Sequence, residues 1–96
     1  MEKPRQRTLP PETARELIKM NLKLLQGDST FSRACGAIAL AEFDYVETSA
    51  ALATAWEVEK DPITKAQMLE SLRRHRNAAA KALCTTIDGL NDKTGK

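Results

Sequence analysis

The dipeptide Asp61-Pro62 constrains the fold of this chain more than any other stretch. An Asp side chain caps the first turn of a helix, and Pro suits the first helical position because it has no N–H to satisfy. Pro also disfavours a helical backbone at the residue before it. We therefore expect one helix to end near Lys60 and another to begin at Pro62.

Helical periodicity extends over residues 29 to 60 before this turn and over residues 62 to 90 after it. Folding the two stretches back at Asp61 places Phe31 opposite Leu90 and Ile38 opposite Leu83. The chain is thus expected to be all-α, with a long antiparallel helical hairpin. The inner faces are expected to carry Phe31, Cys35, Ile38, Tyr45, Leu52 and Trp56 on the first helix, and Leu69, Leu72, Ala79, Ala80, Leu83, Ile87 and Leu90 on the second.

A shorter helix is predicted over residues 10 to 26, because Pro10-Pro11-Glu12 suits a helix start and Gly27 suits a helix end. Asp28 or Ser29 is expected to cap the helix that follows, and Met20 is expected to fill the core. The chain then divides into a flexible basic arm (1–9), a helical hairpin domain (10–90) and a polar tail (91–96).

A second face of the long predicted helix is made mostly of small residues, which permit close approach of another helix. The short first helix cannot cover all of this face, so apolar surface remains near the tip of the hairpin. Such surface predicts self-association into a homo-oligomer. The expected oligomer interface consists of Ala39, Phe43, Val46, Ala50, Ala53 and Trp56.

The net charge is only +2, from 15 basic and 13 acidic side chains, so composition alone does not indicate a nucleic-acid binder. The distribution is uneven, however, and clustered cations neutralise DNA phosphates without reading sequence. A solvated charged face is the alternative interpretation. The candidate DNA-binding residues are Lys3, Arg5 and Arg7 in the arm, Arg15, Lys19 and Lys23 on the first helix, and Arg74 and Lys81 on the last.

Residues with catalytic or metal-binding potential are scattered. His75 has no Cys, Asp or second His at ligand spacing, and no Glu-x-x-His pair is present. We therefore expect no metal, no cofactor and no catalytic residue. Glu42 and Arg76 interrupt the two apolar stripes at neighbouring depths, which predicts a buried ion pair that fixes the register, or two side chains that extend to the edge.

Cys35 and Cys84 are expected to be buried free thiols in a reducing compartment rather than a disulfide. The sequence shows no signal peptide, no lipidation signal and no apolar run long enough to span a bilayer. The prediction is therefore a cytoplasmic protein that does not enter a membrane.

The layout resembles the small terminase subunits of tailed phages. The resemblance lies in a basic arm, a short helix, a long helix containing residues 37–45 (AIALAEFDY), the turn at Asp61-Pro62 and a helix containing residues 68–74 (MLESLRR). It implies a DNA-packaging adaptor, a ring of subunits that binds double-stranded DNA and hands it to a large terminase subunit with ATPase and nuclease activity. Many members have an N-terminal helix-turn-helix domain, for which the arm is too short, so the expected DNA contact is to the backbone.

A function of another class is compatible with the same sequence. A small helical protein–protein interaction module, such as an inhibitor or an assembly scaffold, needs no nucleic-acid contact. The adaptor predicts a large assembly and salt-sensitive DNA binding, whereas the module predicts a monomer or dimer whose binding is insensitive to the basic arm.

Overall fold

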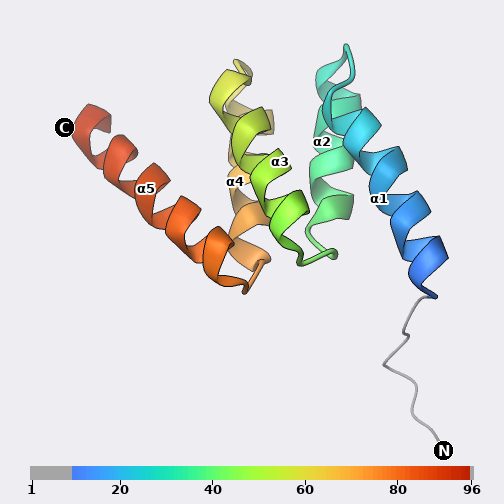
Figure 1. Cartoon of the computed structure of the whole chain (residues 1–96). Coiled ribbons are helices and arrows are strands. Elements are labelled where there is room, and N and C mark those ends of the chain that lie inside the picture. The colour runs from blue at the N-terminus through green and yellow to red at the C-terminus, as the bar shows by residue number, and fades with distance from the viewer. Residues whose placement is uncertain (1–9, 96) are drawn as a thin grey trace, which may run out of the picture.

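The computed structural model describes residues 10–95, with side chains described for residues 10–90. Within that range the chain forms helices connected by short turns and no strand, which confirms the all-α prediction (Figure 1). The helices are α1 (Pro11–Leu25), α2 (Thr30–Leu40), α3 (Val46–Val58), α4 (Pro62–Arg74) and α5 (Ala78–Gly95).

Two of the expected helix boundaries are confirmed by hydrogen bonds. Asp61 caps α4, because its Oδ2 accepts the backbone N–H of Thr64 at 2.9 Å and the Thr64 hydroxyl at 2.8 Å. Ser29 caps α2 by accepting the backbone N–H of Ser32 at 3.0 Å. Helix α1 begins at Pro11 and ends at Leu25, as the flanking Pro and Gly residues predict.

The predicted continuous helix over residues 29–60 is wrong, because the chain turns at residues 41–45 between α2 and α3. The Thr48 hydroxyl accepts the backbone N–H of Tyr45 at 3.2 Å and hydrogen-bonds to the carbonyl of Phe43. These bonds give α3 an N-terminal cap of its own. The periodicity of residues 29–60 belongs to two helices rather than one.

The predicted returning helix is also divided, at residues 75–77. Asn77 caps α5, since its Oδ1 accepts the backbone N–H of Ala80 at 2.8 Å. Asp44, in the turn between α2 and α3, accepts the backbone N–H of Arg76 at 2.7 Å and the side-chain amide of Asn77 at 2.7 Å. The two turns therefore stabilise each other. Helix α5 continues to Gly95, beyond the predicted end of the helical domain at Leu90.

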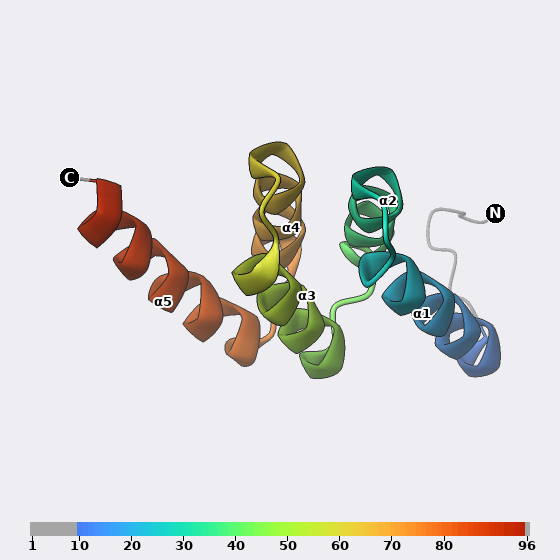
Figure 2. The ribbon, with the colours of Figure 1, turned by 90° about the horizontal axis from the view of Figure 1, so that it is seen from above.

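The helices stack in two layers instead of forming one long hairpin. Helices α1, α3 and α5 lie side by side in one layer, and α2 and α4 form the other (Figure 2). Helix α2 packs on α1 and α4, while α3 packs on α1, α4 and α5. The stack is elongated, with principal extents of 52 × 29 × 20 Å.

The caps reveal a repeat that the side-chain pattern conceals. Ser29 and Asp61 begin the two helices of one layer and are 32 positions apart. Tyr45 and Asn77 begin two helices of the other layer and are again 32 positions apart. The α2–α3 and α4–α5 pairs therefore begin at equally spaced caps, and α2 packs on α4 as α3 packs on α5.

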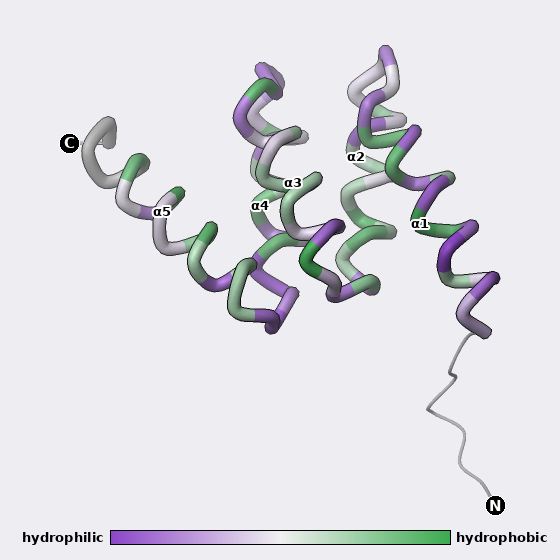
Figure 3. The backbone as a smooth tube through the Cα atoms, in the orientation of Figure 1, coloured by the Kyte–Doolittle hydropathy of each residue, from purple (hydrophilic) through white to green (hydrophobic). Residues whose placement is uncertain are grey.

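Figure 3 shows apolar residues in each labelled helix, and the buried ones come from helices of both layers. The predicted inner stripe is wrong in part: Phe31 is 77% exposed, and Ile38 and Tyr45 are also exposed. The predicted pairing of Phe31 with Leu90 does not occur in a stack in which α2 packs on α1 and α4. Met20, expected to be in the core, is exposed. The buried apolar residues are Leu25, Ala37, Leu40, Leu52, Met68, Leu72, Ala80 and Ile87.

Among residues 10–95, no helix has both the length and the apolar character needed to cross a membrane.

Candidate protein-binding groove

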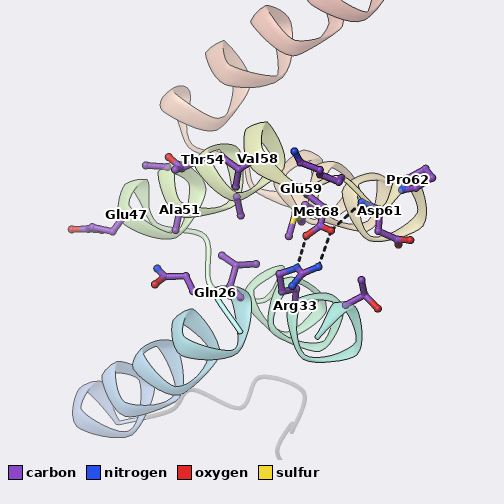
Figure 4. Close-up of a pocket in the computed structure, with 15 residues that line it drawn as sticks. Gln26, Arg33, Glu47, Ala51, Thr54, Val58, Glu59, Asp61, Pro62 and Met68 are labelled. Carbon is purple, nitrogen blue, oxygen red and sulfur yellow. Dashed lines mark hydrogen bonds and ion pairs between the residues drawn. The ribbon is translucent and has the colours of Figure 1, made fainter. Parts of the chain in front are cut away.

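A groove of about 1100 Å³ lies between α3 and the turn that joins α1 to α2. Figure 4 shows Gln26 and Arg33 on one side of it and Ala51, Thr54 and Val58 on the other. The groove is lined by Leu25, Gln26, Thr30, Arg33, Glu47, Ala50, Ala51, Thr54, Ala55, Val58, Glu59, Lys60, Asp61, Pro62 and Met68.

The α3 wall of the groove is formed by small or apolar side chains. Ala50, Thr54 and Val58 recur every four residues, so they lie in a row along one face of the helix. All three are exposed, and Val58 is 72% exposed although it is a large apolar residue. This wall is therefore an uncovered apolar surface along the length of α3.

An ion pair joins the two sides of the groove at one end. Arg33 on α2 donates from Nε to Glu59 Oε1 at 2.6 Å and from Nη2 to Glu59 Oε2 at 3.1 Å. Arg33 also donates to the carbonyl of Gly27 at 2.9 Å, and Glu59 accepts the backbone N–H of Asp61 at 3.1 Å. The pair thereby fastens the α1–α2 turn to the α3–α4 turn.

Burial and hydrogen bonding act in opposite directions on this pair. The side chain of Glu59 is only 2% exposed, yet the hydrogen bond from Arg33 lowers the pKa of Glu59 below its ordinary value. The same hydrogen bond raises the pKa of Arg33. Both groups therefore stay charged at neutral pH, which maintains the ion pair across the end of the groove.

Replacing Glu59 with glutamine should lower the free energy of unfolding at neutral pH by about 2 kcal/mol, because hydrogen bonds to a charged group are lost while the shape is kept. Urea denaturation followed by circular dichroism would measure this. Glu57→Gln, on the exposed surface of α3 two residues before Glu59, is the matched control and should change the value by less than about 0.5 kcal/mol. Equal losses in both variants would contradict the structural role of the Glu59 pair.

Acid should destabilise the fold through four carboxyl groups whose pKa values are lowered by hydrogen bonds. Because the folded-state pKa of each group lies below its unfolded value, its contribution is complete above about pH 4.5 and is lost as pH falls further. The urea midpoint should therefore fall steeply below that pH, and less steeply in Glu59→Gln. The groups and donors are Asp44 with the Arg76 backbone, Glu59 with Arg33, Asp61 with the Thr64 backbone, and Asp88 with Arg73.

A second polar cluster is buried between α3 and the α4–α5 turn. His75 Nε2 donates to the carbonyl of Leu40 at 2.9 Å, and His75 Nδ1 accepts the hydroxyl of Ser49 at 2.6 Å. The Ser49 oxygen in turn accepts the side-chain amide of Asn77 at 3.0 Å. Ser49 is 0% exposed and His75 is 3% exposed, so no substrate reaches this serine–histidine pair. The cluster joins α2, α3 and the α4–α5 turn.

Sequence reasoning considered His75 only as a metal ligand and so missed this structural role. Among the described residues, no group of three or more His, Cys, Asp or Glu side chains is arranged to hold a metal ion. The signal for His75 is that it closes α4 at a position where the chain turns. The role of His75 can be inferred from this position only after the turn between α4 and α5 has been located.

The predicted DNA-binding residues separate into groups. Arg15, Lys19 and Lys23 are exposed along α1, at one end of the stack. Arg74 and Lys81 are exposed near the turn between α4 and α5, toward the other end (Figure 1). Lys3, Arg5 and Arg7 lie outside the described residues. The described basic side chains therefore do not form one continuous surface.

The predicted oligomer-interface residues do not share one face either. Ala53, Phe43 and Trp56 pack against the core of the same chain. Trp56 also lies under the Lys65 ammonium group, which is 4.3 Å from its ring centre. Ala39 is half-buried, whereas Val46 and Ala50 are exposed. Of the predicted set, Ala50 is the residue that lines the groove.

The predicted buried pair of Glu42 and Arg76 is wrong. Both residues are exposed, and Glu42 lies 3.6 Å from Arg74 instead. The turns at residues 41–45 and 75–77 carry the two side chains out of the helical faces on which the prediction placed them. Cys35 and Cys84 are free thiols and are half-buried.

The described residues thus form an all-α stack of helices with a groove between α3 and the α1–α2 turn. Comparisons with known proteins add nothing to this class, since no family model, no curated protein and no solved structure matches the chain.

Proposed function

We propose that this chain is a non-enzymatic protein–protein interaction module whose groove binds a helical segment of another polypeptide. The single observation that carries the proposal is the exposed row of small or apolar side chains, Ala50, Thr54 and Val58, set opposite the α1–α2 turn. Concave, mostly apolar sites with a few polar side chains are where proteins bind ligands and segments of partners.

The lining favours a helix over an extended segment. An extended backbone exposes N–H and C=O groups that need partners when they are buried. The α3 wall offers Ala50, Ala51 and Ala55, whose side chains cannot hydrogen-bond, and its polar side chains are Thr54 and Glu47. A helix satisfies its own backbone, and small side chains allow close approach of the two helix axes.

The experiment uses a fluorescein-labelled reference peptide of about 18 residues, roughly five helical turns, with Leu and Ala on one face and Lys on the other. The full chain should bind it saturably with a dissociation constant in the micromolar range. Thr54→Arg, which places a bulky charged side chain in the groove, should weaken binding about tenfold or more, a loss of about 1.4 kcal/mol. Fluorescence anisotropy measures both affinities.

Two controls define the result. Thr85→Arg introduces the same side chain at an exposed position of α5 outside the groove and should leave the affinity unchanged. A peptide of the same composition with central prolines, which cannot form a helix, should bind weakly. Unsaturable binding, or binding that Thr54→Arg leaves intact, would argue against the groove as the site.

A DNA-packaging adaptor is the second candidate, and the line of exposed Arg15, Lys19 and Lys23 on α1 favours it. The long hairpin on which the small-terminase resemblance depended is replaced by a two-layer stack, so the basic line is its remaining support. In this alternative the chain binds double-stranded DNA and a large terminase subunit.

If DNA is bound through α1, affinity for a short duplex should fall steeply between about 50 and 200 mM salt. Lys19→Glu should reduce the slope of log affinity against log salt by about 1 or more, because a phosphate contact is lost. Lys60→Glu, at an exposed residue outside α1 and outside the predicted DNA-binding set, is the charge-matched control. A salt dependence that is the same in wild type and Lys19→Glu would remove α1 from the DNA-binding surface.

A further inference from the structure

We propose that α5 carries a second binding surface equivalent to the groove wall on α3, and that the partner is one polypeptide with two helices packed side by side. The inference rests on the proposed function, since it extends the same kind of contact from one helix to two. It is carried by the spacing of the caps, by matching exposed side chains on α3 and α5, and by the packing of these two helices.

The exposed row on α3 recurs on α5 at the same positions after the helix cap. The α3 row stands 5, 9 and 13 positions after the cap Tyr45 and consists of Ala50, Thr54 and Val58. The residues 5, 9 and 13 positions after the cap Asn77, which we call the α5 row, are Ala82, Thr86 and Leu90. Each row is an alanine, a threonine and a branched apolar residue in the same order.

Core packing does not account for this match. Ala82 and Thr86 are exposed, as their counterparts on α3 are, so neither helix uses these residues to bury its inner face. By contrast, Leu40 and Leu72, which also match at this spacing, are both 0% exposed and belong to the core. Substitutions at exposed positions usually change stability little. A match at the surface therefore points to a contact outside the chain.

The α5 row also carries no charge, although the solvent-facing side of a helix is typically charged or polar. The exposed positions of α1 are largely charged and include Arg15, Glu16, Lys19 and Lys23. On α5 the exposed Lys81 and Asp88 lie outside the row, and Asp88 Oδ1 is paired with Arg73 Nη2 of α4 at 2.6 Å. The α5 row is thus suited to a small or apolar contact, as the α3 row is.

The packing of α3 and α5 sets the form of the partner. The two helices contact each other in one layer, with α3 between α1 and α5 (Figure 2). The axes of packed helices lie about 8–10 Å apart. Helices seated on the two rows would therefore be separated by about the distance between two packed helices. A helical hairpin has this spacing, so a single partner of that form reaches both rows at once.

The two surfaces should differ in depth and therefore in affinity. Beside the α3 row, the groove is lined by Ala51 and Ala55. The corresponding positions of α5 hold Leu83 and Ile87, whose larger side chains belong to or pack against the core. They leave less room for an incoming side chain, so the α5 surface should bind a single helix about tenfold more weakly than the groove does.

The first test counts binding sites by isothermal titration calorimetry with the reference peptide. Wild type should bind two peptides per chain, one more tightly than the other. Thr86→Arg should remove the weaker site and Thr54→Arg the tighter one, and the double variant should bind none. Ala82→Arg blocks the α5 row at a second position and should act as Thr86→Arg does.

The second test joins two reference segments through a short glycine-containing loop, so that they form a helical hairpin. Because the second contact is then intramolecular, the linked peptide should bind wild type about 100-fold more tightly than the single peptide, with one linked peptide per chain. Either Thr54→Arg or Thr86→Arg should abolish this gain. Thr85→Arg, one position away on α5 and outside the row, is the matched control and should keep both the gain and the number of sites.

The outcomes separate this inference from the proposed function. A single site that Thr54→Arg removes and Thr86→Arg leaves intact would refute the α5 surface and leave the groove function standing. Two sites without any gain for the linked peptide would overturn the two-helix partner. An effect of Thr85→Arg equal to that of Thr86→Arg would overturn the assignment to the α5 row. Peptide binding that neither Thr54→Arg nor Thr86→Arg reduces would refute both proposals.

Discussion

Replacing His75 with alanine should lower the free energy of unfolding by about 3 to 4 kcal/mol, a large fraction of the stability of a domain of this size. The substitution leaves the carbonyl of Leu40 without its donor and the hydroxyl of Ser49 without its acceptor, in a region that water does not reach. Each unsatisfied buried group costs about 1 to 3 kcal/mol, and the missing ring leaves a cavity.

Urea denaturation followed by circular dichroism measures this loss. Ser49→Ala, which removes one hydrogen bond and little volume, should cost about 1 to 2 kcal/mol. Because the two residues are in contact, the double variant should lose less than the two single losses combined. Additive losses would mean that the bond between Ser49 and His75 contributes little. A change below about 1 kcal/mol in His75→Ala would contradict the buried network itself.

Gly36→Ala should destabilise the protein by about 2 kcal/mol, although alanine is the better helix former by about 1 kcal/mol. A Cβ atom at Gly36 would lie 2.6 Å from the backbone nitrogen of Leu25 and 2.7 Å from the carbonyl oxygen of Asn21. These are backbone atoms of α1, so the contact is relieved only if α1 moves away from α2. Because Leu25 lines the groove, the reference peptide should also bind with altered affinity.

Gly89→Ala is the matched control, since the same Cβ on α5 meets no atom within 4 Å. There the gain in helix propensity is unopposed, and stability should increase by about 0.5 to 1 kcal/mol. Opposite signs at the two glycines are thus expected in thermal or urea denaturation. An increase at both positions would show that α1 and α2 do not approach as closely as the structure places them.

The sequence predicts those features that depend on neighbouring residues. The caps at Ser29 and Asp61 and the extent of α1 follow from Pro, Gly, Asp and Ser at short spacing, and they are confirmed. The all-α class follows from the period of the apolar residues. Such signals are local because they arise from hydrogen bonds and dihedral angles within one helical turn.

The turns at residues 41–45 and 75–77 were missed because neither contains Gly or Pro, although Asp44 and Asn77 are residue types that favour turns and helix caps. Asp44 ties them together across 32 and 33 positions of sequence, through the backbone of Arg76 and Asn77. A hydrogen bond between residues so far apart in the sequence produces no periodic pattern of apolar residues from which it can be predicted. The predicted hairpin therefore failed at the two places where tertiary hydrogen bonds override helical propensity.

The groove escaped prediction for a related reason. Ala50 was assigned to an apolar face, but the opposite wall comes from Gln26 and Arg33, whose position depends on how α1 and α2 pack on α3. Arg33 and Glu59, 26 positions apart, carry the ion pair at its end, and nothing in their surroundings in the sequence indicates a partner. Surface that is shaped by three helices is visible only after they are assembled.

Because the caps are spaced 32 positions apart, the molecule can be lengthened in units of one helix pair. Residues 45–76 contain one helix from each layer, beginning at the cap of α3 and ending just before the cap of α5. A duplicated copy of that segment inserted before Asn77 would place Arg76, and not Asp44, directly before the second Tyr45, so the hydrogen bonds that Asp44 accepts from the α4–α5 turn would be missing at the new junction. Lengthening the molecule by one helix pair therefore also requires an Asp at that junction.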